Sequence, residues 1–281
     1  MNNPEISVVL PVWNGEQHLQ DAIHSILNQS FGNFELLIVD DASTDETPKI
    51  LNEFSLIDSR IKIIRNYKNM KLPASLNVGF RVAKGDWFTW TSDDNILEED
   101  CLEILLNSAI QNHADFVYSN YKVIDEKNQQ IKINTTGPSE NLLLENTIGA
   151  SFLYNRRVRD LIGNYDTNKF MFEDYDYWVR IYKSKLKMMH VEKVSPYKYR
   201  IHSNQLSNQR KLPKSFLYFR FELAQSINEK GRKARAHLGV LKLAFRMRQP
   251  KLFFTSLFHF LKINPTVSYP VLYKLIVDKK K

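Results

Sequence analysis

Residues 6–12, ISVVLPV, and residues 34–39, FELLIV, decide the fold class of this 281-residue chain. Both runs are apolar at nearly every position, which predicts strands buried on both faces. Between them, LQDAIHSIL at 19–27 has apolar residues at positions 19, 22, 23, 26 and 27, the spacing of an amphipathic helix. A buried strand, a helix and a second buried strand predict a right-handed βαβ unit.

The same alternation continues along the chain. We expect helices at 47–54, 72–82 and from 98 to 111, and strands at 61–64, 87–91 and 116–118. Residues 128–146 are polar and are expected to be irregular, followed by a helix at 176–184 and a strand at 195–201. The sequence therefore predicts an α/β fold with a mostly parallel sheet flanked by helices.

Composition limits the class of protein. The chain is 43% hydrophobic and 25% charged, as in ordinary globular proteins. Its single cysteine, Cys101, cannot form an intrachain disulfide and fits a reducing cytosol. We expect no signal peptide, and no apolar run approaches the roughly 18 residues of a membrane span.

The net charge of +8 is unevenly distributed. Residues 206–281 hold 17 Lys and Arg against 3 Asp and Glu, whereas residues 1–205 hold 22 against 28. The basic character belongs to the tail, and the body of the chain is acidic.

Polar clusters follow three of the expected strands: WNGE at 13–16, DDAS at 40–43 and SDDN at 92–95. The carboxyl ends of parallel strands meet at one edge of the sheet, where ligands of such folds bind. The sequence thus predicts one binding site made from all three clusters.

Asp93 and Asp94 are the clearest candidates for cation ligands. Adjacent carboxylates repel one another unless a cation neutralises them, and oxygen ligands beside a phosphate favour Mg²⁺ or Mn²⁺. The alternative is a solvated turn or a helix cap. One carboxylate of the pair Asp40 and Asp41 could accept from a uracil N–H or a ribose hydroxyl, and Trp13 could stack on the base. The alternatives are a turn with helix capping for the pair and a packing role for Trp13.

Several motifs in order resemble family 2 glycosyltransferases of the GT-A fold. They are residues 7–15 (SVVLPVWNG), 25–31 (SILNQSF), 34–45 (FELLIVDDASTD), 76–79 (LNVG), 83–86 (AKGD) and 92–95 (SDDN). The resemblance is dense from residue 6 to about 105. It thins to FEDYDYWVR at 172–180 and YRIH at 199–202, and ends before 210.

The resemblance implies roles for particular residues. The donor nucleotide-sugar would contact Pro11, Trp13, Asn14, Asp41, Asn77 and Asp93. Asp94 would bind the cation, and His202 would lie near the metal or the diphosphate. Asp174 would be the general base, with Glu173 orienting the loop or the acceptor; the alternative is an ordinary acidic helix start. Thr91 stands where many relatives have an acid, which puts only a secondary contact in doubt.

The implied enzyme is an inverting hexosyl- or N-acetylhexosaminyltransferase of class EC 2.4. It would move sugar from a UDP-linked donor to a glycan or lipid-linked acceptor in cell-surface polysaccharide synthesis. Residues 1–105 would form the nucleotide-sugar-binding half and 106–205 the acceptor-binding and catalytic half of one domain, with acceptor specificity in 128–170. Residues 206–281 would form a basic helical tail.

The tail sequence predicts two amphipathic helices, at 232–248 and 251–262. In the first, Leu238, Leu241 and Phe245 share one face. Such helices could bind an anionic membrane surface, pack on the body or form an oligomer. We expect a cytoplasmic protein, peripheral at the inner face of the cell membrane.

Other nucleotide-binding classes lack their motifs here. No G-x-G-x-x-G follows the first strand, no G-x-x-x-x-G-K-[ST] is present, and no Gly-rich basic loop of a nucleotidyltransferase opens the chain. A nucleic-acid-binding protein without transferase activity would suit the pI of about 9.3. The acidic body argues against it, so we expect no nucleic-acid partner.

Overall fold

The computed structural model describes residues 3–206, 212–267 and 276. The chain forms two compact units. The α/β unit consists of Met1–Ser139 and Thr147–Gln209, and the helical unit of Glu140–Asn146 and Arg210–Lys281. Each unit is therefore built from two separate stretches of chain.

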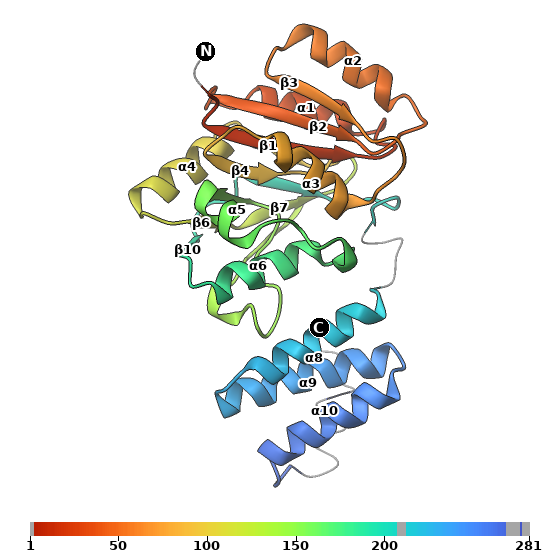
Figure 1. Cartoon of the computed structure of the whole chain (residues 1–281), viewed down its shortest axis with the longest axis vertical. Helices are drawn as coiled ribbons and strands as arrows, with labels where there is room; N and C mark the ends of the chain where they lie inside the picture. Colours follow the sequence, from red (N-terminus) through yellow and green to blue (C-terminus); the bar gives the residue numbers. More distant parts are fainter. Residues whose placement is uncertain (1–2, 207–211, 268–275, 277–281) are drawn as a thin grey trace. The chain divides into compact units, whose positions relative to one another are not determined.

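A seven-stranded sheet in the order β10-β6-β9-β4-β1-β2-β3 forms the centre of the α/β unit (Figure 1). Its strands are β1 (Ile6–Val12), β2 (Phe34–Asp40), β3 (Ile61–Arg65), β4 (Trp87–Trp90), β6 (Phe116–Ser119), β9 (Phe152–Asn155) and β10 (Met188–Val191). Every residue of β1 and β2 is buried, as their apolar runs predict. All pairs are parallel except those of β9, which runs antiparallel to both β4 and β6.

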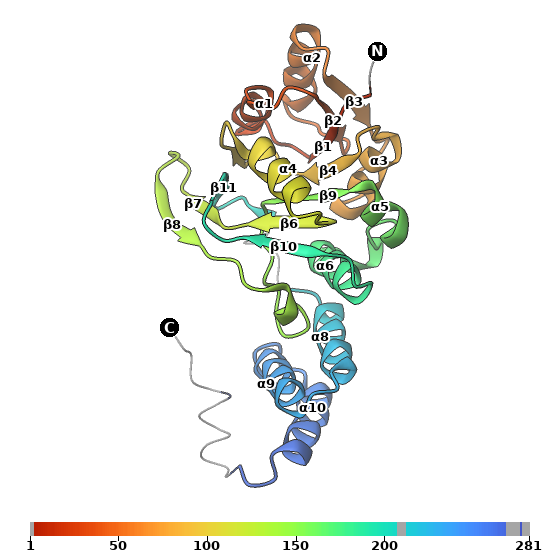
Figure 2. The same cartoon turned by 90° about the vertical axis from the view of Figure 1, so that its left-hand side faces the viewer.

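Helices cover both faces of this sheet (Figure 2). They are α1 (Leu19–Leu27), α2 (Thr47–Ile57), α3 (Leu72–Val82), α4 (Cys101–Gln111), α5 (Arg156–Ile162) and α6 (Glu173–Lys183), with a short 3-10 turn at Thr167–Lys169. A second 3-10 turn, Ser139–Asn141, belongs mostly to the helical unit. Alternate residues of β1 face opposite sides. Val8 packs with α1, α2 and α4 in one core cluster, while Val9 lies against Gly79 of α3. The expected two-sided cover is confirmed.

A second, four-stranded sheet has the order β5-β11-β7-β8. Its strands are β5 (Ile96–Leu97), β7 (Tyr121–Ile124), β8 (Gln130–Asn134) and β11 (Tyr197–Arg200). The expectation that residues 128–146 are irregular was wrong for β8, which pairs antiparallel with β7. Four of its five residues are exposed, so β8 buries no apolar face that a sequence pattern could reveal.

The helical unit contains α8 (Lys214–Ser226), α9 (Lys230–Arg246) and α10 (Pro250–Ile263). Its core includes Leu217, Val240 and Leu252 from the three helices and Leu144 from the other stretch. The residues expected to share one face of α9 differ in burial: Leu241 is buried, whereas Phe245 is 54% exposed. Among the described residues, no helix is long and apolar enough to cross a membrane.

Candidate active site

The loop after β1 is bonded to the loop after β2. The backbone N–H of Asn14 donates to Ser43 Oγ (3.0 Å), and its side-chain Oδ1 accepts from the Thr44 N–H (2.9 Å). Asn14 has a positive φ of 54°, which asparagine tolerates better than most residues. Its side chain thus fixes the shape of the rim where both strands end. The polar clusters expected to share one edge do so here.

The Asp41 carboxylate organises one side of this rim. It is 4% exposed and accepts from Asn66 Nδ2 (2.8 Å), the Met70 N–H (2.7 Å) and the Lys71 N–H (2.9 Å). Asp41 therefore holds the whole segment 66–71 in place. Motif reasoning pointed to Asp41 alone and missed this segment, which has no local sequence signal.

An aromatic ring stands beside this segment. Trp13 is 51% exposed, and the Lys71 Nζ lies 5.7 Å from the centre of its ring. An exposed ring next to a cation can stack on a planar base. This position is compatible with the predicted role of Trp13, which stays a prediction. Pro11 is buried in β1, opposite Val39 of β2, and a contact between Pro11 and the donor stays a prediction.

Asp93 fits against a glycine. A Cβ atom placed on Gly15 would lie 2.0 Å from Asp93 Oδ2 and 2.6 Å from Val12 Cγ2. Only glycine lets the first loop approach the acidic pair so closely. Burial, helped by the neighbouring charge of Asp94, raises the pKa of the Asp93 carboxyl to about 8.

Asp94 pairs with a residue 108 positions later. Its Oδ2 lies 3.0 Å from His202 Nε2, while its Oδ1 is buried and has no hydrogen-bond partner among the described residues. Arg200 contacts the backbone of Asp94, but the pair still leaves one buried carboxylate oxygen with no donor or cation beside it among the described residues. A divalent cation binds such an oxygen, so the residues present fit one.

His18, which the sequence reasoning missed, also faces this acidic pair. Its ring centre lies 5.1 Å from that of His202, edge to face, and its Nε2 is buried with no partner among the described residues. Burial, together with the charge of Arg200, lowers the pKa of His18. Among residues 3–206, 212–267 and 276, no group of three or more His, Cys, Asp and Glu side chains is placed so that it could hold a metal ion by itself.

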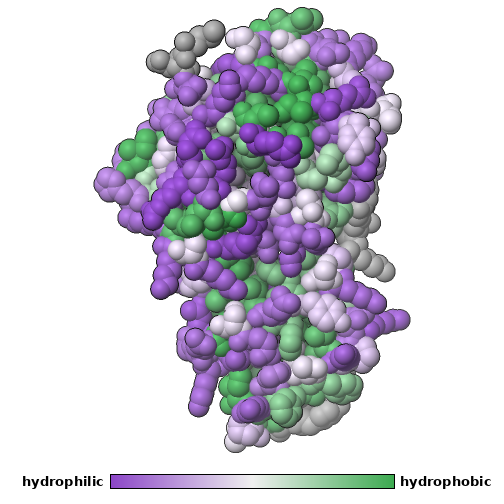
Figure 3. All heavy atoms as spheres, viewed as in Figure 1, coloured by the Kyte–Doolittle hydropathy of each residue, from purple (hydrophilic) through white to green (hydrophobic). Residues whose placement is uncertain are grey.

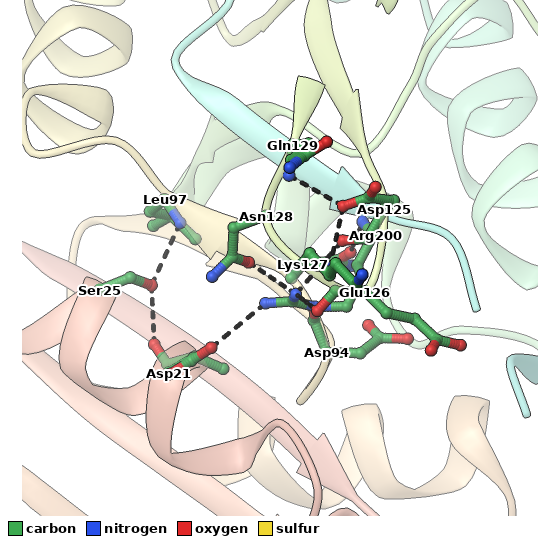
Figure 4. Close-up of polar contacts among 12 residues, drawn as sticks. Asp21, Ser25, Asp94, Leu97, Asp125, Glu126, Lys127, Asn128, Gln129 and Arg200 are labelled. Carbon is green, nitrogen blue, oxygen red and sulfur yellow. Dashed lines mark hydrogen bonds and ion pairs between the residues drawn. The ribbon is translucent and has the colours of Figure 1, made fainter. Parts of the chain in front are cut away.

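A buried arginine braces the acidic pair (Figure 4). Arg200 is 1% exposed, and its Nε donates to the backbone carbonyl of Asp94 (2.8 Å). Its other nitrogens reach Asn128 Oδ1 (2.6 Å), the Glu126 carbonyl (3.3 Å) and Asp21 Oδ2 (3.4 Å). Arg200 thus joins the acidic pair to the β7–β8 turn and to α1. Its role was not predicted from the sequence, because partners 72 to 179 positions away leave no local pattern.

The second acidic pair begins α6. Asp174 Oδ1 accepts from the Tyr175 N–H (2.6 Å), and Glu173 is 4% exposed. Burial and the adjacent charge of Asp174 raise the pKa of Glu173 to about 8, and its Oε2 has no hydrogen-bond partner among the described residues. Burial, together with the neighbouring Tyr177, raises the pKa of Tyr165 well above its usual value.

Asn77 connects the two halves of the α/β unit. Its Nδ2 donates to the Tyr165 carbonyl (2.9 Å), and its Oδ1 accepts from the Tyr165 N–H (2.8 Å). Trp90 Nε1 donates to the Tyr165 hydroxyl (3.0 Å). Both amide atoms of Asn77 are thus engaged in holding the segment before Asp174; a donor contact for Asn77 stays a prediction.

Comparisons with known proteins decide the family. Residues 7–179 match the description "Glycosyl transferase family 2". The chain belongs to this family. The expected family is thereby confirmed, and it is a family of glycosyltransferases.

Two similar proteins show how far the similarity extends. A glycosyltransferase of Haemophilus influenzae is 40% identical over 136 residues, which is 48% of this chain and 54% of that protein. The chain thus spans about half the length of this relative. The Escherichia coli protein WfgD, a UDP-Glc:α-D-GlcNAc-diphosphoundecaprenol β-1,3-glucosyltransferase, is 31% identical over 186 residues, or 65% of this chain and 72% of that protein.

A solved structure supports the fold. Residues 1–349 of S. aureus TarS in complex with UDP-GlcNAc match with a TM-score of 0.71 at 15% identity. The match covers 96% of this chain and 86% of that one. The GT-A fold expected from the sequence is confirmed.

Proposed function

We propose that this protein is an inverting glycosyltransferase that moves a sugar from a UDP-linked donor to a glycan or lipid-linked glycan acceptor in cell-surface polysaccharide synthesis. The observation that carries the proposal is the acidic pair at the end of β4. Asp94 has one oxygen beside His202 and one buried oxygen with no hydrogen-bond partner in the part of the chain that the structure describes, and Asp93 lies next to it. Such a pair suits the cation of a diphosphate donor.

The donor side is assigned to the rim formed by β1, β2 and β4. Trp13 would stack on the base and the loop held by Asp41 would line its edge, while Asp93 would contact the ribose or the donor sugar. Two similar proteins support a UDP donor, since TarS was solved with UDP-GlcNAc and WfgD is named for UDP-Glc. The WfgD name also includes a lipid-linked acceptor, which supports that acceptor class here.

Asp94 and His202 would hold the Mg²⁺ or Mn²⁺ ion. The bound ion would supply positive charge for the departing diphosphate. Asp174 would take the proton from the acceptor hydroxyl as that oxygen attacks the anomeric carbon. Glu173 would be protonated and neutral, because its pKa is raised. Asp174 would then be the only negative charge of the pair and would act as the base.

Substitutions at the two acidic pairs test these roles. Asp94→Ala should abolish Mn²⁺-dependent thermal stabilisation by UDP-sugars as well as transfer. Asp174→Asn should keep that stabilisation and lower turnover by roughly 100-fold or more, the scale of general-base loss. The exposed Asp160→Asn, on α5, is the control and should behave like the wild type in both assays.

The assay panel should contain UDP-glucose, UDP-GlcNAc and other nucleotide-sugars with and without Mn²⁺. No stabilisation by any of them would refute the transferase proposal. Turnover that survives in Asp174→Asn would remove Asp174 from the base role only. We further propose that the protein works in the cytoplasm at the inner face of the membrane.

A further inference from the structure

Helix α10 has two unlike faces. Leu252, Ser256 and Phe260 are buried. Phe254 and Phe258 are each 65% exposed, although phenylalanine is among the most apolar side chains. A face that only meets water is normally polar, so these two rings need another explanation.

The exposed rings belong to a continuous stripe. At 100° per residue, Lys251, Phe254, Phe258 and Lys262 fall within about 80° of one another around the helix. All four are exposed. We call these four residues the Lys–Phe stripe. Its order, with a lysine at each end of two aromatic rings, lets the rings enter an apolar layer while the ammonium groups reach outward to charged groups.

The end of α9 continues this surface. Phe245, 54% exposed, has its ring centre 6.3 Å from that of Phe253, whose ring in turn lies 5.4 Å from Phe254. Arg246 and Arg248 beside it are also exposed. Figure 3 shows hydrophobic residues at the surface over α9 and α10, among hydrophilic ones. The patch is therefore aromatic with a cationic rim.

Charge decides between the possible occupants. Residues 212–267 carry 11 Lys and Arg and only 2 Asp and Glu. A second copy of this unit would bring like charges together around the same patch, which disfavours association. Anionic lipid headgroups complement the charge, and the acyl layer beneath them accepts the rings.

We propose that the Lys–Phe stripe and Phe245 insert into an anionic membrane surface. This assigns the membrane contact of the proposed function to a defined face of α10. Its use for reaching a lipid-linked acceptor rests on the proposed function. The membrane-binding surface itself is inferred only from the exposure and charge of its residues. The helix lies in the plane of the headgroups and does not cross the membrane.

The test is co-sedimentation of the full chain with vesicles of phosphatidylcholine containing phosphatidylglycerol, compared with phosphatidylcholine alone. The wild type should bind the anionic vesicles and lose binding at high salt. Phe254→Ser with Phe258→Ser should lower the partition coefficient by about tenfold or more. The control, Leu56→Ser with Ile57→Ser, removes two residues that are 86% and 74% exposed on α2, and should bind like the wild type.

Circular dichroism and light scattering complete the experiment. Unchanged helix content in Phe254→Ser with Phe258→Ser, called the double phenylalanine variant, would show that its loss of vesicle binding is not caused by unfolding. Equal vesicle binding by this variant and the wild type would overturn the proposal. So would a wild-type dimer that the variant converts to monomer with no change in vesicle binding, because the stripe would then be a contact between copies.

A transfer assay with a soluble acceptor separates this proposal from the enzyme proposal. The double phenylalanine variant should retain turnover on that acceptor. Vesicle binding without any nucleotide-sugar turnover would refute the enzyme and leave the membrane surface standing. Turnover by a wild type that does not bind vesicles would refute the membrane surface and leave the enzyme proposal standing.

Discussion

Replacing Gly15 with alanine tests the placement of Asp93 directly. The new Cβ would start 2.0 Å from Asp93 Oδ2 and 2.6 Å from Val12 Cγ2, whereas ordinary contacts begin near 3.4 Å. Val12 is buried in β1 and cannot retreat easily. The Asp93 carboxylate or the loop after β1 must therefore move by more than about 1 Å, a misplacement that can cost ~100-fold in rate.

We expect two measurable consequences. Overpacking should lower the free energy of unfolding by about 1–3 kcal/mol in urea titrations. The affinity for UDP-sugar in the presence of Mn²⁺, measured by calorimetry, should fall together with kcat/KM, by about 100-fold for the latter.

Gly32→Ala is the matched control, because a Cβ at Gly32 meets no atom within 4 Å. It should change neither quantity. The reasoning fails if Gly15→Ala is folded and retains kcat/KM within about threefold of the wild type. Equal loss in both variants would show that the cause is not the approach to Asp93.

Three further predictions concern buried polar groups. Arg200→Met should lower the free energy of unfolding by about 3 kcal/mol and weaken the thermal stabilisation by Mn²⁺ and UDP-sugar, and Arg200→Lys should recover part of both. Unchanged urea midpoints and Mn²⁺ titrations would contradict this prediction. Glu173 has a pKa near 8 in the folded protein against 4.5 unfolded, so its stabilisation, present at low pH, is lost as pH rises from about 5 to 8. Urea titrations at pH 5 and pH 8 should show a lower free energy of unfolding at pH 8 for the wild type, and a smaller difference between the two pH values for Glu173→Gln. His237 is fully buried, and burial lowers its pKa from 6.5 to about 4, so the free energy of unfolding should drop as pH falls between those values. In thermal melts at pH 4.5, His237→Leu should therefore have a higher melting temperature than the wild type. Equal melting temperatures would count against this role of His237.

Periodicity predicted the elements that bury an apolar surface. β1, β2 and α1 have continuous or helical apolar patterns, and their bounds follow from the sequence almost to the residue. β8 was missed because its side chains face solvent. The strand β9 was not predicted at all, because its four residues are too few to show a period, and its antiparallel direction leaves no mark on the sequence of a single strand.

The site divides in a similar way. Asp41, Asp93 and Asp94 follow strands, so topology alone places them at one edge. The proximity of His202 to Asp94 was expected only from the family resemblance, and the structure brings the two within 3.0 Å. Arg200 lies between segments far apart in sequence, so its position depends on tertiary packing that no local pattern encodes.

The two-part construction of the helical unit limits how this protein can be rearranged. Leu144 packs in the core of that unit, and Arg220 and Arg232 donate to the carbonyls of Leu144 and Glu140. A recombination event that exchanged everything after residue 210 would leave segment 140–146 fitted to a partner that is no longer there. In an exchange of tails between relatives, this short segment therefore has to travel with the tail it supports.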